Sequence, residues 1–111
     1  MIMANNLEEK VFLAVEEFSK ILNVKPKEIK FRKMKRRWGS CKKDKIILNK
    51  NLEFLPEDLI RYVVYHEMCH LLIKNHRKEF KLLIEKIYPD YKTYQKRLAE
   101  YYLLINRSLK T

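Results

Sequence analysis

The chain has 111 residues and 47% hydrophobic residues, which fit one globular domain over residues 1–111 and exclude a disordered chain. Its 25 Lys+Arg against 14 Asp+Glu give a net charge of +11. Such a charge favours anionic partners such as nucleic acid or nucleotides, although a lysine-rich soluble surface has the same composition.

The first predicted element is an amphipathic helix over residues 6–22. Asn6 can cap its start, and the acidic Glu8 and Glu9 suit its first turn. This region lacks the basic start and unbroken apolar stretch of a signal peptide, and no segment is apolar over the roughly 18 residues of a membrane span. We therefore expect no membrane contact and a cytoplasmic location. The predicted core stripe of this helix is Leu7, Val11, Val15, Phe18 and Leu22.

Residues 29–38 and 45–49 are predicted to be two strands of an antiparallel hairpin. In the first, "IKFRKMKRRW", apolar and basic residues alternate at the start, and the second is the short apolar run "KIILN". The intervening "GSCKKD" is predicted to be a turn. Gly39 is the only glycine of the chain, so we expect this turn to need its backbone freedom. Close approach of a substrate is the alternative reason for Gly39.

Three more helices are predicted in the second half of the chain. Pro56 with two acids after it is a good start signal, and the helix should run to about Lys74. The next helix should cover about 77–87 and end before Pro89. Asp90 can cap a last helix that reaches about residue 108.

The segment "YHEMCHLLIKNH" holds every histidine of the chain. His66 and His70 are four residues apart, so on a helix they lie on one face and can bind the same Zn²⁺. Glu67 directly follows the first histidine. In an HExxH pattern this glutamate is not a ligand, and it takes a proton from the attacking water.

His76 can join the two histidines only if the helix stops or bends between His70 and His76. Asn75 tolerates the left-handed conformation of a helix end and could permit this. Three histidine ligands leave the fourth position open, as catalytic zinc sites do. Cys69 points away from the shared face and is expected to be a small core residue. A purely structural metal in an interaction domain stays open as an alternative.

Several motifs together resemble the YgjP-like metallopeptidase family, which is related to the SprT and WLM proteases within the minimal zincins. The resemblance covers about residues 24 to 102. It implies an α+β fold, in which a small antiparallel sheet packs on the HExxH helix between flanking N- and C-terminal helices. The motifs are "MKRRWGSC" (34–41), "IILN" (46–49), "YVVYHEMCHLL" (62–72) and "NHRKEF" (75–80).

Carried over residue by residue, the resemblance implies one Zn²⁺ per chain, held by three histidines, with Glu67 as the catalytic glutamate. The ligands would be His66, His70 and His76. The residues that match the RWGSC motif are Trp38, Gly39, Ser40 and Cys41. The chain departs from the family at Arg77 and Lys81, where NHS and FW are common, and this concerns the cleft near His76.

The sequence thus predicts a zinc-dependent metallohydrolase, above all a peptidase, in which Glu67 is the general base. The residues expected to contact substrate or nucleic acid are Arg36, Arg37, Trp38 and Gly39. The candidates for stabilising the oxyanion are Arg36, Arg37, Tyr62 and Tyr65, of which Tyr65 is expected to be a core residue.

Two alternatives follow from the basic run "KFRKMKRR" (30–37) beside the site. The first is a metal-dependent hydrolase of nucleotide phosphoanhydrides. The second is a nucleic-acid-associated protease or binding module, since aromatic residues among basic ones suit single strands. The sequence does not predict the oligomeric state.

Overall fold

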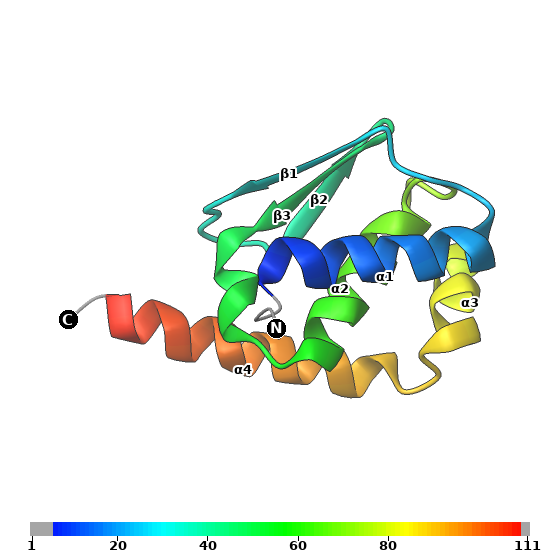
Figure 1. The fold of residues 1–111 in the computed structure, drawn as a ribbon. Coiled ribbons are helices and arrows are strands. Elements are labelled where there is room, and N and C mark those ends of the chain that lie inside the picture. Colours follow the sequence, from blue (N-terminus) through cyan, green and yellow to red (C-terminus); the bar gives the residue numbers. More distant parts are fainter. Residues whose placement is uncertain (1–5, 110–111) are drawn as a thin grey trace, which may run out of the picture.

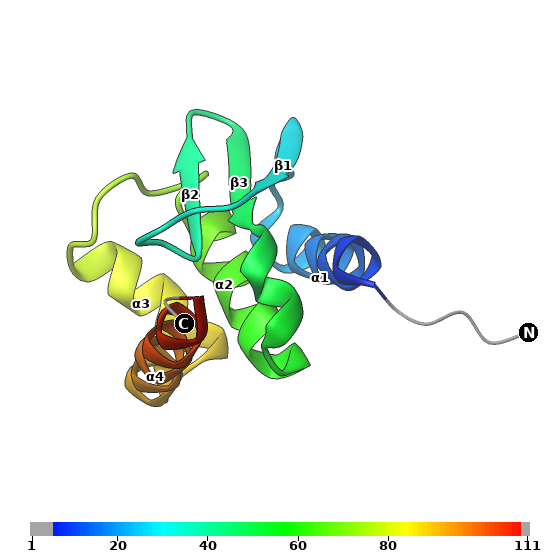
Figure 2. The ribbon, with the colours of Figure 1, turned by 90° about the vertical axis from the view of Figure 1, so that its left-hand side faces the viewer.

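The computed structural model describes residues 6–109, so the predicted domain extends at both ends beyond the described part. Four α-helices lie below a small three-stranded sheet, which confirms the α+β class (Figure 1). Figure 2 shows the sheet above α2, with α1 on one side and α3 and α4 on the other. None of the helices in residues 6–109 is long and apolar enough to cross a membrane. The elements are α1 (Leu7–Leu22), β1 (Glu28–Arg32), β2 (Gly39–Lys42), β3 (Lys45–Asn49), the 3₁₀ turn η1 (Lys50–Phe54), α2 (Glu57–Cys69), α3 (Lys78–Ile87) and α4 (Tyr91–Leu109).

Helix α1 forms as its sequence predicts. The Asn6 side chain accepts a hydrogen bond from the Glu9 N–H at 2.9 Å, which satisfies one of the free donors at the helix start. Asn23 ends the helix in the left-handed conformation, with φ of 55°. Four of the five residues in the predicted stripe are buried and Leu7 is partly buried, so α1 covers one side of the core.

The sheet is mixed rather than antiparallel, with strand order β1-β3-β2. Residues of β1 pair with β3 in parallel, and the antiparallel hairpin consists of β2 and β3. The predicted hairpin between 29–38 and 45–49 is therefore wrong. The first four residues of the predicted turn form β2, and the turn itself is Lys43, with φ of 58°, and Asp44. Because β2 occupies one edge of β3, β1 pairs with the other edge of β3.

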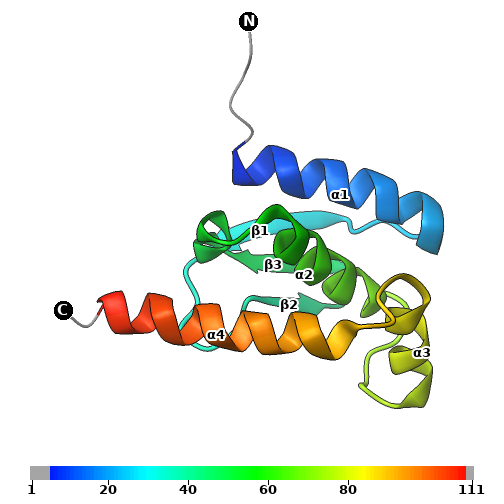
Figure 3. The same ribbon diagram turned by 90° about the horizontal axis from the view of Figure 1, so that it is seen from below.

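Helix α2 lies at the centre of the molecule, between α1 and α4 (Figure 3). It begins after Pro56 as predicted but ends at Cys69, five residues before Lys74. Helices α3 and α4 match their predicted ranges within one residue. Because the sheet and three helices contact it, α2 is buried on most of its surface. Its buried residues are Leu59, Ile60, Tyr62, Val63, Val64, Tyr65, Glu67, Met68 and Cys69.

Candidate metal centre

The three histidines converge at the end of α2. One ring nitrogen from each of His66, His70 and His76 lies within 4.8 Å of the other two. The Nε2 atoms of His70 and His76 are 3.1 Å apart. Two nitrogens bound to one tetrahedral zinc at the usual bond length are about 3.3 Å apart, so this pair already has the separation that a shared ion requires.

The chain reaches this arrangement because α2 ends at Cys69. The N–H groups of the next three residues bond to carbonyls three positions back, which tightens the last turn. The His70 Nδ1–H then donates to the Ile73 carbonyl at 2.9 Å. That bond fixes the ring proton on Nδ1 and leaves the Nε2 lone pair free for a metal. Burial also lowers the pKa of His70, which favours the neutral form that binds metals.

Asn75 assists the turn in a different way from the one predicted. Within residues 6–109, only Asn23 and Lys43 are non-glycine residues with positive φ, so Asn75 is not left-handed. Its side-chain oxygen instead accepts the Arg77 N–H at 2.9 Å, which closes a short turn around His76. The chain after α2 is thus folded back by side-chain hydrogen bonds, and the helix break that His76 needs is present.

Phe80 packs against all three imidazoles, a role that the sequence analysis did not assign. Its ring is stacked on His70, with centroids 4.3 Å apart. It meets His66 and His76 edge-on, with ring centroids 5.2 and 5.0 Å apart, respectively. Phe80 is buried in the first turn of α3, so this helix helps to fix the orientations of the three rings. Its place in "NHRKEF", four residues after His76, was the available signal.

Glu67 is close to the histidine cluster and is only 6% exposed. Its carboxylate accepts a hydrogen bond from His66 Nδ1 at 3.1 Å. Gly39 packs directly behind it. A Cβ at position 39 would lie 3.0 Å from the Glu67 Cγ and 3.3 Å from the Ile47 carbonyl oxygen. Because Gly39 has no positive φ, the predicted need for backbone freedom is wrong; the need is space for Glu67.

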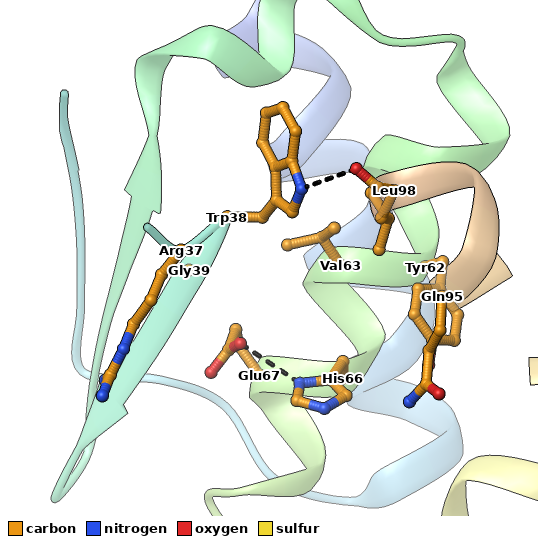
Figure 4. A pocket seen from close by; sticks show the side chains of 9 residues that line it. All are labelled: Arg37, Trp38, Gly39, Tyr62, Val63, His66, Glu67, Gln95 and Leu98. Carbon is orange, nitrogen blue, oxygen red and sulfur yellow. Dashed lines mark hydrogen bonds and ion pairs between the residues drawn. The ribbon is translucent and has the colours of Figure 1, made fainter. Parts of the chain in front are cut away.

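Three hollows meet at this cluster, and His66 borders all of them. The first, about 230 Å³, lies between β2 and α4 (Figure 4). The second, about 420 Å³, lies between β2 and the loop after α2. The third, about 260 Å³, lies among α2, α3 and α4. His66 therefore borders all three hollows, Glu67 the first and second, and His76 the second and third.

The predicted substrate-contact residues divide into two groups. Arg37, Trp38 and Gly39 line the first hollow, and Arg37 and Gly39 also line the second. Arg36 is exposed and lines none of the three. The Trp38 indole N–H donates to the Leu98 carbonyl of α4 at 3.3 Å, which joins the two walls of the first hollow.

Asn49 fixes the position of these residues, a role that its place at the end of a predicted strand did not indicate. It is buried, and its side-chain amide donates to the carbonyls of Met34 at 2.9 Å and Arg37 at 2.7 Å. These bonds satisfy carbonyls of the basic segment between β1 and β2 and fix its path. The asparagine in "IILN" was the signal for this role.

The remaining predictions concern residues that contribute to the core. Tyr65 is fully buried, and its hydroxyl donates to the Leu83 carbonyl at 2.7 Å, as expected for a core residue. Cys69 is also fully buried, and burial raises the pKa of its thiol to about 12. Cys41 is partly buried beside the second hollow, and both cysteines are free.

A family model for the YgjP-like metallopeptidase domain matches residues 2–101. The chain belongs to the YgjP-like metallopeptidase family. This membership makes the domain a metallopeptidase, which points to peptides or proteins as its substrates. No curated relative matches the chain.

Two solved structures share the fold of this YgjP-like domain. The metallopeptidase zymogen abylysin of Pyrococcus abyssi is 23% identical, with a TM-score of 0.70, and the match covers 79% of this chain and 90% of that one. The metallopeptidase zymogen jannalysin of Methanocaldococcus jannaschii is 22% identical, with a TM-score of 0.74, and the match covers 90% of this chain and 95% of that one. The architecture of four helices and a small mixed sheet is thus that of known metallopeptidases.

Proposed function

We propose that this domain hydrolyses peptide bonds with one Zn²⁺ held by His66, His70 and His76, and with Glu67 as general base. The observation that carries the proposal is the convergence of three imidazoles beside one buried carboxylate at the meeting point of three hollows. Three nitrogen ligands leave a fourth position, which distinguishes a catalytic donor set from a filled structural one.

The residues divide the chemistry among them. Zinc in such a site lowers the pKa of water to about 7 and polarises a substrate carbonyl. Glu67 takes a proton from the attacking water and passes it to the leaving amine. Among the four oxyanion candidates, Arg37 is the exposed cation that lines two hollows beside Glu67. Arg37 is therefore our candidate for stabilising the charge on the substrate oxygen.

The first test is metal content and activity in protein purified without a histidine tag. We expect about one zinc per wild-type chain and weaker retention in His76→Ala. Glu67→Gln should keep its zinc and lose about 10²- to 10⁴-fold in peptide hydrolysis. The exposed Glu79→Gln on α3 is a matched control that should keep full activity. Unchanged turnover in Glu67→Gln would exclude the assigned general base.

The cations around the cleft favour nucleotide phosphoanhydride hydrolysis as a second candidate function. The residues that line the three hollows include four cations, and Glu67 is the acid among them. Such a lining attracts phosphates. Release of phosphate or pyrophosphate from nucleoside triphosphates, measured beside casein cleavage, separates the two reactions. The cations are Arg37, Lys74, Lys81 and Lys92.

Nucleic-acid binding has less support from the geometry. Phe31 in the basic run and Trp38 directly after it are partly buried against the core rather than presented for stacking. Binding that rests on charge alone would weaken steeply with salt and show no base preference.

A further inference from the structure

The first hollow has the chemical character of a side-chain pocket. Its back wall is apolar and consists of Trp38 from the segment before β2, Val63 from α2 and Leu98 from α4 (Figure 4). Its charged and polar residues include Glu67, His66 and Gln95, which lie below the apolar wall in Figure 4, and Arg37, which lies apart from them on the β2 side. A mostly apolar cavity with a few polar groups on one side is typical of a binding pocket.

The volume of the hollow suits one side chain. At about 230 Å³ it is larger than the roughly 150 Å³ apolar cavity that is known to hold benzene. A leucine, methionine or phenylalanine side chain fits such a space. A charged side chain would lose its hydration against the apolar wall, and the charged groups of the lining, Arg37 and Glu67, are those assigned to the reaction.

The position of the hollow ties it to the reaction. His66 and Glu67 form part of its lining, so an occupant lies beside the proposed metal ligand and the general base. Val63 is one helical turn before Glu67 on α2, which places this part of the back wall and the carboxylate on the same face of the helix. The residue whose side chain enters the hollow must therefore be next to the bond that reacts.

We propose that this hollow, the Trp38–Leu98 pocket, selects peptide substrates with a large apolar side chain next to the scissile bond. The inference rests on the proposed peptidase function and adds its substrate class. The Trp38 indole, held by its bond to the Leu98 carbonyl, gives the pocket a fixed wall. Burial of the side chain against that wall supplies binding energy close to the reacting atoms.

Peptides that differ at one residue, on either side of the cleaved bond, test the selectivity. We expect kcat/KM for leucine or phenylalanine to exceed that for alanine by about ten- to a hundredfold at one position. Aspartate and lysine should be poorer than alanine there. Equal rates for all these residues at both positions would overturn the pocket while leaving the peptidase function intact.

Two variants should shift this preference in opposite directions. Val63→Phe fills the pocket from its back wall and should move the preference toward alanine. Leu98→Ala widens it and should favour tryptophan over leucine. The exposed Leu103→Ala on the same helix is a control that should change neither. If Val63→Phe and Leu98→Ala keep the wild-type preference, the pocket assignment is wrong.

Trp38 is the only tryptophan of the chain, so its fluorescence reports occupancy without turnover. In Glu67→Gln, peptides with leucine or phenylalanine should shift the emission saturably, and the Val63→Phe change should abolish the shift. That result without any cleavage by the wild type would refute the peptidase but keep the pocket. The proposal would be overturned if only nucleoside triphosphates shifted the Trp38 emission. It would also be overturned if none of the probes shifted it.

Discussion

The two sides of α2 differ in how they are packed. On the α1 side, one face of α1 is buried from Val11 to Leu22, and Phe18 meets Tyr65 of α2 edge-on with ring centroids 4.9 Å apart. On the cleft side, formed by β2, the segment before it and α4, the three hollows separate the elements. There α4 is held by the buried Leu98, aromatic contacts of Tyr94 and a few polar bonds.

This difference shows how a small domain combines a stable helix with an open site. The HExxH residues need a rigid backbone, and the close packing of α1 on α2 provides it. They also need access for a substrate, so the other side of α2 cannot be filled. Stability is expected to be uneven across the fold, with α4 opening before α1.

The largest loss of stability should come from the α1 side. Phe18→Ala removes a fully buried ring and should lower the free energy of unfolding by about 3–5 kcal/mol. Denaturant unfolding measures this value. Leu13→Ala on the exposed face of α1, where Leu13 is 62% exposed, should change it by less than about 0.5 kcal/mol. Similar losses in the two variants would contradict the assignment of the α1 core.

Gly39→Ala should affect activity more than stability. The added methyl would lie 3.0 Å from the Glu67 Cγ and would have to displace this side chain. We expect about 1–3 kcal/mol of destabilisation from overpacking, together with a loss of peptide hydrolysis in the protein that remains folded. Zinc titration should show near-normal affinity, because the three histidines keep their places. Full activity in this variant would mean that Glu67 has room to move.

Trp38→Phe should loosen only the cleft side. It removes the indole N–H that donates to the Leu98 carbonyl and should cost about 0.5–1.5 kcal/mol. Hydrogen exchange locates the effect: amides of α4 should exchange faster, and those of α1 should not change. Equal acceleration in both helices would show that the two sides open together.

The smallest effect concerns the ion pair between α2 and α4. A hydrogen bond from Arg97 lowers the pKa of Asp58, so the folded state favours the charged carboxylate. The stabilisation is present above the unfolded pKa of about 3.9 and is lost as the pH falls through the lower folded pKa. Because both side chains are about one-third to one-half exposed, it should not exceed about 1 kcal/mol.

Unfolding measured against pH checks this contribution. The difference in unfolding free energy between the wild type and Asp58→Asn should be constant near neutrality and shrink below about pH 4. Added salt should reduce it as well. A difference that persists in acid would have to come from something other than the Asp58 charge.

The sequence by itself determined the local features. The cap at Asn6, the apolar stripe of α1 and the start of α2 after Pro56 follow from interactions within a few residues, so their patterns are visible in the chain. The same holds for His66 and His70, whose spacing equals one helical turn. The motifs also led to the family, which the match over residues 2–101 confirms.

Tertiary structure decided whatever depends on residues distant in the chain. The pairing of β1 with β3 depends on which edge of β3 remains after β2 has paired, and no local pattern contains this. The reason for Gly39 is a carboxylate 28 positions later that needs its space. The Trp38–Leu98 pocket joins segments that only the fold brings together. Side-chain packing between such segments is decided by the whole core, so it can be read only from the folded chain.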